Sequence, residues 1–267
     1  MMNAKIKSEI YGLYHELGIT SPSEIDLEAI AYYKNARVQY KPLKGCEARI
    51  IGVDGRAIIT VNDSASLERQ LFSIGHELGH WFKDRGKVGS LCSKSDMEEG
   101  KCSLNHREKT ANSFASELLM PHFLFSPVAK DIDLTIDGIQ YVKSMFSASF
   151  MATIRRTIRL GHHVGFLACY GSDGVRKYFE CTPELPYNFI PPQHMPVGSA
   201  IQTLISNKTK VAPSFVDGEV WSRADISFGG VVREHAFHYH GDDFLTLVWW
   251  EDEAPIVEWI EREHTEA

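Results

Sequence analysis

The spacing of hydrophobic and polar positions changes near residue 161 and divides this 267-residue chain into two parts. Before that point, apolar residues recur mainly every three or four positions, which is typical of amphipathic helices. The pattern predicts helices over 3–18, 21–34, 64–84 and 106–121, with two more inside 133–160. Short strands are expected at 38–40, 48–53 and 56–61, with a hairpin turn at Asp54-Gly55.

After Gly161 apolar and polar residues alternate, which indicates strands. Two hairpins are expected, one over 164–181 and one over 231–250, with a helix near 199–206 between them. The sequence therefore predicts an α+β protein with two domains. Residues 1–162 form the first domain, with a helical subdomain at about 133–160, and residues 163–267 form a β-rich second domain.

Composition argues against a membrane-spanning, a secreted or a disulfide-framework protein. Hydrophobic residues make up 43% of the chain, but no apolar run approaches the length of a membrane span, so none is expected. The first ten residues lack the apolar core of a secretory signal, and five scattered cysteines do not suit a disulfide framework. Both features favour a reducing cytoplasm.

A net charge of −7 argues against a chain-wide electrostatic interaction with nucleic acid. One local group of cations, Arg155, Arg156 and Arg159, is a candidate nucleic-acid contact, although an ordinary solvated helix face is the simpler interpretation, because charge runs are usually just that.

The predicted helix over 64–84 contains His76-Glu77-Leu78-Gly79-His80, an H-E-x-x-H motif. Residues four apart lie on one face of a helix, so both imidazoles can reach one metal ion, with Glu77 beside it. Two nitrogen ligands, a position for water and a carboxylate base are what a zinc hydrolase requires. The alternative is a buried helix with two hydrogen-bonded histidines.

A zinc hydrolase needs a third protein ligand, and Glu108 is the best candidate. It begins a face of the next helix that continues through Ala111, Asn112 and Ala115, and alanines suit close packing against Gly75 and Gly79. Glu117, Glu98 and Glu99 are rival ligands, and Glu108 could also be a solvated glutamate.

Two neighbouring segments offer further roles at this predicted site. Cys92 and Cys102 lie in a polar loop over 85–105, and one of them could bind the zinc as an inhibitory thiolate; otherwise they are ordinary loop thiols. Arg49–Val53 could be an edge strand that aligns a substrate backbone, or simply a structural strand.

Two separated strings, H-E-L-G-H and E-x-x-A-N-x-F-A-x-E-L-L-M-P, occur in that order and resemble the ImmA/IrrE family of metallopeptidases over roughly residues 20–160. The resemblance implies that His76, His80 and Glu108 bind Zn²⁺ and that Glu77 is the catalytic residue. It also implies a site-specific endopeptidase that cleaves a helix-turn-helix repressor and so derepresses stress or anti-phage defence genes.

The layout also resembles relatives of the CapP type, which are linked to CBASS anti-phage operons, and this would imply activation by single-stranded DNA. Some relatives carry a GAF- or PAS-like sensor domain where this chain has its β-rich part. A different function remains open: a non-catalytic zinc-containing sensor or binding protein that controls a repressor by association. The sequence does not determine the oligomeric state.

Overall fold

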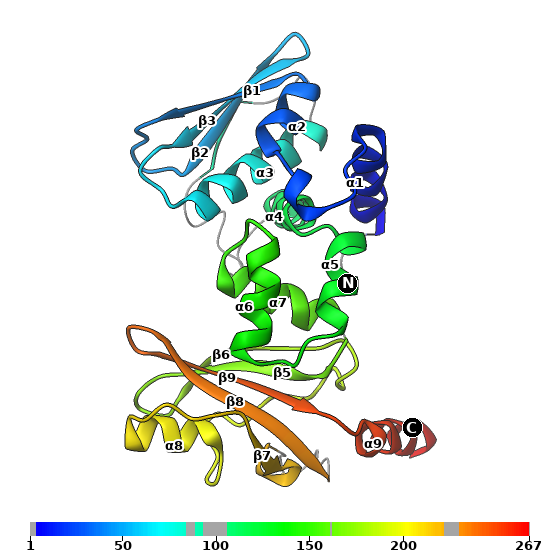
Figure 1. The fold of residues 1–267 in the computed structure, drawn as a ribbon, viewed down its shortest axis with the longest axis vertical. Coiled ribbons are helices and arrows are strands. Elements are labelled where there is room, and N and C mark those ends of the chain that lie inside the picture. The colour runs from blue at the N-terminus through cyan, green and yellow to red at the C-terminus, as the bar shows by residue number, and fades with distance from the viewer. Residues whose placement is uncertain (1–3, 84–88, 93–105, 161, 222–229, 267) are drawn as a thin grey trace. The chain divides into compact units, whose positions relative to one another are not determined.

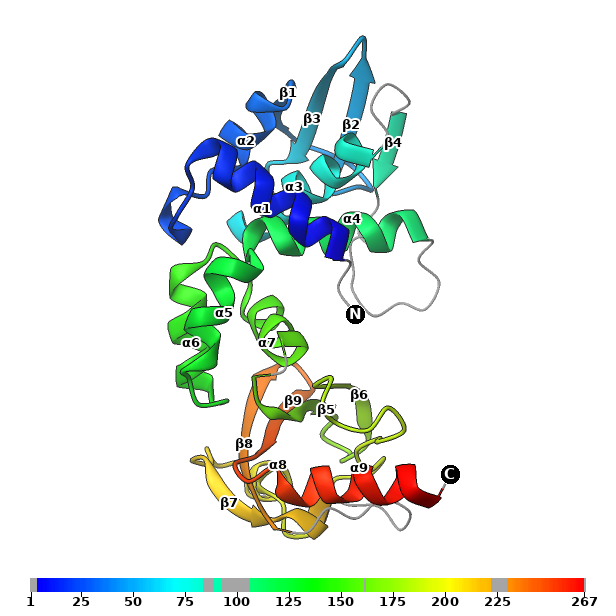
Figure 2. The ribbon, with the colours of Figure 1, turned by 90° about the vertical axis from the view of Figure 1, so that its right-hand side faces the viewer.

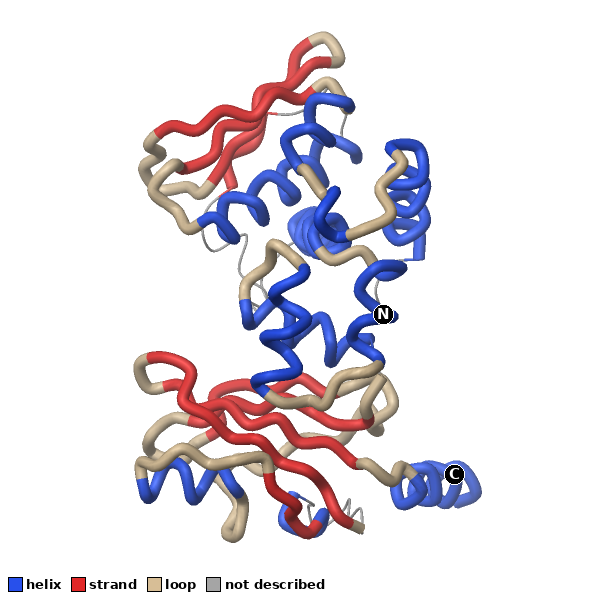
Figure 3. The backbone as a smooth tube through the Cα atoms, in the orientation of Figure 1, coloured by secondary structure: helices blue, strands red, loops and turns tan. Residues whose placement is uncertain are grey.

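The computed structural model describes residues 4–83, 89–92, 106–160, 162–221 and 230–266 (Figure 1). It has two compact units. The first comprises residues 1–128 and 142–152, and the second comprises residues 129–141 and 153–267. The predicted α+β class is confirmed, with helices and strands in both units (Figure 3). The predicted domain boundary between residues 162 and 163 stays a prediction.

The first unit begins with helix α1 (Ala4–Leu17), whose buried residues Ile6, Ile10, Leu13 and Tyr14 follow helical spacing. The prediction of one continuous helix over 21–34 is wrong. A short 3-10 helix, η1 (Pro22–Glu24), precedes α2 (Leu27–Tyr33). The Asp26 side chain accepts hydrogen bonds from the backbone N–H groups of Glu28 and Ala29, and this N-cap starts a new helix at Leu27.

Four strands form the sheet of the first unit in the order β1-β3-β2-β4: β1 (Ala36–Lys41), β2 (Ala48–Val53), β3 (Arg56–Asn62) and β4 (Gly89–Cys92). β1 runs parallel to β3, while β2 runs antiparallel to β3 and β4. Asp54 and Gly55 both have positive φ (50° and 73°), which fits the tight hairpin turn predicted there.

The possible role of Arg49–Val53 as an open edge strand is wrong, because β2 is paired on both sides. Residues 48–51 pair with β4 as well as with β3. β4 comes from the long segment between the two predicted metal-binding helices, for which the sequence predicted only a loop.

Helices dominate the middle of the chain. They are α3 (Leu67–Lys83), α4 (His106–Leu119), α5 (His122–Lys130), α6 (Ile136–Met145) and α7 (Phe150–Leu160). The two helices predicted inside 133–160 are present as α6 and α7, whereas α5 was not predicted. Among the described helices, none combines the length and apolar character needed to cross a membrane.

The second unit contains a five-stranded antiparallel sheet in the order β6-β5-β9-β8-β7: β5 (Val164–Tyr170), β6 (Arg176–Cys181), β7 (Ser214–Asp217), β8 (Val231–His240) and β9 (Asp243–Trp250). The first and last of these strands in the chain, β5 and β9, are neighbours near the centre. This order is compatible with the GAF- or PAS-like prediction, which stays a prediction.

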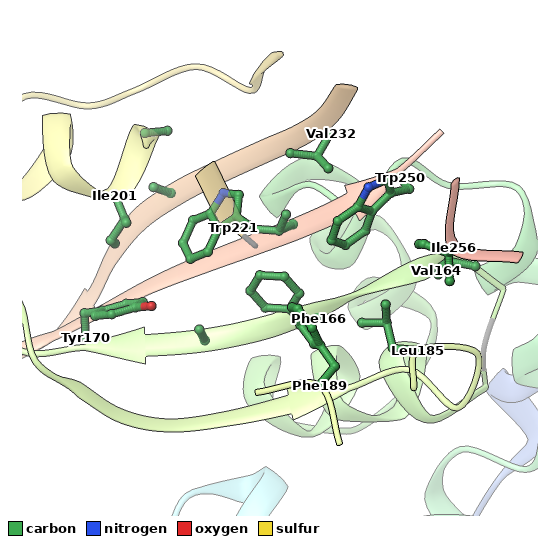
Figure 4. Close-up of a cluster of buried hydrophobic side chains, with 14 of the residues drawn as sticks. Val164, Phe166, Tyr170, Leu185, Phe189, Ile201, Trp221, Val232, Trp250 and Ile256 are labelled. Atoms are coloured by element: carbon green, nitrogen blue, oxygen red, sulfur yellow. The ribbon is translucent and has the colours of Figure 1, made fainter. Parts of the chain in front are cut away.

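An aromatic core lies on one face of this sheet, beside α8 (Ala200–Asn207), the 3-10 helix η2 (Gly218–Trp221) and α9 (Ala254–Glu266). Figure 4 shows the rings of Phe166, Trp221 and Trp250 gathered there, with Phe166 5.3 Å from Trp221 between ring centroids. Trp221 and Trp250 are almost fully buried, so these aromatic residues pack the core.

One charged side chain, Glu234 on β8, is completely buried beside this core. One carboxylate oxygen accepts hydrogen bonds from the Ile201 N–H and the Thr246 hydroxyl (both 2.9 Å). The other accepts from the Ala200 N–H (2.9 Å) and the Trp221 indole N–H (3.3 Å). Burial raises the pKa of Glu234 although these donors oppose the rise. The carboxylate thus joins β8 to the start of α8, to η2 and to β9.

We expect Glu234→Gln to destabilise the second unit by at least about 2 kcal/mol, because an amide nitrogen would face donors that now share a carboxylate oxygen. Urea unfolding followed by tryptophan fluorescence would measure this, since four of the five tryptophans lie after residue 160. Glu258→Gln, at an exposed position on α9, is the matched control. Equal midpoints for both variants would contradict a stabilising role for the Glu234 carboxylate.

Candidate metal centre

The candidate centre depends on the close contact of α3 and α4 (Figure 2). A Cβ atom built on Gly75 would lie 3.1 Å from the Cα of Ala115, and one built on Gly79 would lie 3.0 Å from the Cα of Ala111. Both distances are shorter than ordinary contacts, so a side chain at either position would require the backbone of α4 to shift. The close approach predicted from the glycine and alanine positions is confirmed.

His76 and His80 lie one turn apart on α3, and both are fully buried. Their Nε2 atoms are 3.1 Å apart. The ring centroids are 4.7 Å apart and the ring planes stand nearly perpendicular, at 82°. In both rings, therefore, the Nε2 atom points toward the same place.

Glu108 completes the cluster from the first turn of α4. Its Oε2 atom lies 3.2 Å from His76 Nε2 and 3.4 Å from His80 Nε2. Its side chain keeps 15% of its surface exposed, but the Oε2 atom that faces the histidines is buried. A carboxylate in the first turn is also favoured by the positive end of the helix dipole.

These three residues form the only candidate metal-binding group that the described part of the chain contains. Two ligands at about 2.0–2.1 Å from a tetrahedral zinc ion lie about 3.3 Å apart, close to the separations found here. Burial, and then the neighbouring His76, lower the pKa of His80 to about 4. Its imidazole is therefore neutral near pH 7, as a metal ligand must be. The donor set fits zinc.

Asn112 is a residue of this site to which the sequence analysis assigned no role. Its Oδ1 atom lies 2.8 Å from Nδ1 of His76, and both side chains are buried. If the amide oxygen accepts this hydrogen bond, the His76 proton is on Nδ1 and the lone pair of Nε2 points into the cluster. The position of Asn112, one turn after Glu108, was visible in the sequence, but its partner on another helix was not.

Glu77 follows His76 directly and is also fully buried. It is not one of the three clustered ligands, which agrees with a separate role. A buried carboxylate beside a metal centre can accept a proton from water, and we assign this role to Glu77 below.

The other residues considered from the sequence lie elsewhere or outside the description. Glu117 is buried and accepts a hydrogen bond from the His122 N–H, away from the histidine pair. Glu98, Glu99 and Cys102 lie outside the described residues. Cys92 ends β4, where its backbone pairs with Ala48, but its side chain is also outside the description. The inhibitory thiolate stays a prediction.

Arg155, Arg156 and Arg159 do not share one open surface. Arg156 is buried, with 2% of its surface exposed. Arg155 and Arg159 both form ion pairs with Glu180 of β6, and Arg155 also lies over the Tyr178 ring. Their predicted contact with nucleic acid stays a prediction.

Two sequence comparisons identify the first part of the chain. Residues 31–157 match the model of the IrrE N-terminal-like domain, Peptidase M78. The chain is also 29% identical, over 119 residues, to the phage-like element PBSX protein XkdA of Bacillus subtilis. That match covers 45% of this chain and spans about half of the relative, 54% of its length.

A search of solved structures finds similarity to a transcriptional regulator of Mycobacterium tuberculosis, with a TM-score of 0.59. The likeness covers 92% of this chain and 76% of that one, but only 12% of the aligned residues are identical, so it concerns the fold alone. The sequence matches are the ones that define the relationship. Residues 31–157 of this chain, which contain the His76, His80 and Glu108 cluster, belong to the ImmA/IrrE family of Peptidase M78 proteins.

Proposed function

We propose that this protein is a zinc-dependent, site-specific endopeptidase that cleaves a helix-turn-helix transcriptional repressor. The observation that carries the proposal is the convergence of His76 Nε2, His80 Nε2 and Glu108 Oε2 beside the buried Glu77. Two histidines and one carboxylate are the ligands of a catalytic rather than a structural zinc site, because the fourth position stays open.

When bound, a zinc ion supplies an acidified water and a positive charge that polarises the scissile carbonyl. His76, His80 and Glu108 hold the ion, and Asn112 keeps His76 in the required tautomer. Glu77 accepts a proton from the attacking water and then delivers it to the leaving amine nitrogen. The site therefore needs no covalent intermediate with the protein.

A repressor as the substrate is supported by the family and by the character of the similar proteins. One relative is a protein of a phage-like element, and the structural neighbour is a transcriptional regulator. Cleavage of a repressor would switch on genes of stress response or anti-phage defence. Single-stranded DNA as the activator, which the CapP resemblance implies, stays a prediction that the placement of Arg155, Arg156 and Arg159 does not strengthen.

Glu77→Gln tests the chemistry. We expect this variant to retain zinc but to cleave about 10²–10⁴-fold more slowly, because a general base contributes that much to the rate. The substrate to test is a helix-turn-helix repressor from the same genome, starting with any that is encoded next to this chain. Fragments are measured by mass spectrometry and zinc by atomic spectroscopy.

Casein is the control substrate for this experiment. Rapid digestion of casein would contradict a dedicated regulatory protease. Normal cleavage of the repressor by Glu77→Gln would remove Glu77 as the base. Repressor inactivation without any cleavage, equally by the native chain and by Glu77→Gln, would instead favour a non-catalytic zinc protein that acts by association.

His80→Ala and Glu108→Ala should each lose most of the bound zinc, because two ligands cannot hold the ion as tightly as three. Glu117→Gln is the matched control. It changes the rival glutamate of the same helix while keeping an oxygen for the His122 N–H, so zinc content should be unchanged. Loss of zinc from Glu117→Gln, with retention in Glu108→Ala, would exchange the roles of the two glutamates.

Asn112→Leu should weaken zinc binding by about 10–100-fold, which is the usual effect of removing a hydrogen-bond partner of a metal-binding histidine. Asn112→Asp keeps an acceptor for His76 Nδ1 and should restore most of the affinity. Competition with a coloured zinc chelator measures the affinity, and circular dichroism checks the fold. If the leucine and aspartate variants bind zinc equally, Asn112 only fills space.

A further inference from the structure

The sheet of the first unit has one face that packs on α3 and another that remains exposed. Ile50 and Ile59 point inward and are fully buried, and Gly52 lies against Trp81 of α3. The alternate residues point to the opposite face. There, Arg37 of β1, Ile58 of β3 and Ile51 of β2 form one row across three strands, because Arg37 pairs with Ile58 and Ile58 pairs with Ile51.

An apolar groove of about 850 Å³ lies over this row. Its exposed aliphatic side chains are Ile51 (53%), Val53 (64%) and Ile58 (47%). Tyr32 and Tyr33, at the end of α2, also line the groove, as do Arg37 and Arg56. Such a concentration of exposed apolar residues on a soluble unit marks an interaction surface rather than ordinary scatter.

The cations of this face have no carboxylate partners among the described residues. Arg37 and Arg56 line the groove, and Arg49 precedes Ile51 on the same face of β2. The Nε atom of Arg49 is buried without a hydrogen bond to the described chain. By contrast, the described arginines Arg155, Arg159 and Arg233 each form an ion pair.

The groove itself is lined by no aspartate or glutamate among the described residues. Its positive charge therefore stands out in a chain with a net charge of −7. Guanidinium groups bind carboxylates with two parallel hydrogen bonds, and they do so most strongly beside apolar surface that excludes water.

We propose that this groove binds an acidic, amphipathic segment of a partner protein. The aliphatic row would take its apolar side chains, and Arg37 and Arg56 would take its carboxylates. A stacked nucleic acid fits less well, because the row across the strands presents the aliphatic side chains Ile58 and Ile51, not aromatic rings on which bases could stack. The binding surface lies on the sheet face opposite α3, so it does not depend on the chemistry of the metal centre.

Two labelled peptides with leucine at the same positions test this proposal, one with glutamate and one with lysine at all other positions. Fluorescence anisotropy with the full chain at physiological salt should show binding of the glutamate peptide alone. Ile58→Ser, and the pair Arg37→Glu with Arg56→Glu, should each weaken it by about tenfold or more.

The pair Lys210→Glu with Arg262→Glu is the matched control, because it makes the same charge change at exposed positions outside the groove. The affinity of this double variant for the glutamate peptide should stay within about twofold of that of the native chain, since salt screens the effect of distant charges. All substituted groove positions are on the surface, and circular dichroism confirms the fold of each variant.

Three results would overturn the proposal. The first is equal binding of the two peptides, or no binding of either. The second is a dimer, seen by light scattering, that Ile58→Ser dissociates, because the groove would then hold a second copy of the chain. The third is binding of a single-stranded oligonucleotide, without the glutamate peptide, that is lost when Arg37 and Arg56 are reversed.

Discussion

The candidate centre exists because two helices approach more closely than ordinary side chains permit. Gly75 and Gly79 each cost α3 roughly 1 kcal/mol of helix stability relative to alanine. In return, the backbone of α4 at Ala111 and Ala115 lies directly against α3. This contact places Glu108 within 3.4 Å of both histidine Nε2 atoms. Backbone spacing between the helices therefore determines whether three side chains can share one ion.

Much of this arrangement could be predicted from short-range patterns. Helical periodicity and the H-E-x-x-H spacing predicted α3, the same periodicity predicted α4, and Asp54-Gly55 predicted the β2–β3 hairpin. These features depend on residues a few positions apart, which a sequence shows directly. The ligand roles of His76, His80 and Glu108 are still predictions, although the three side chains do lie together.

The failures share a different physical origin. The helix predicted over 21–34 is divided by a side-chain hydrogen bond at Asp26, which competes locally with helix continuation. β2 acquired a second neighbour, β4, from a segment with weak strand character and a distant position in the chain. The partner of Asn112 lies 36 residues away in the sequence, and the partners of Glu234 lie 12 to 34 residues away. No periodicity of the sequence could pair residues that far apart.

The hydrogen bond between Asn112 and His76 bears on how the ion enters the site. A histidine that can rotate or change tautomer loses that freedom when it binds a metal, and the loss weakens the observed affinity. Here the ring is already fixed by an amide from the neighbouring helix, and its free nitrogen already faces its co-ligands. Most of the ordering entropy is thus lost during folding, so binding of the ion requires little further ordering.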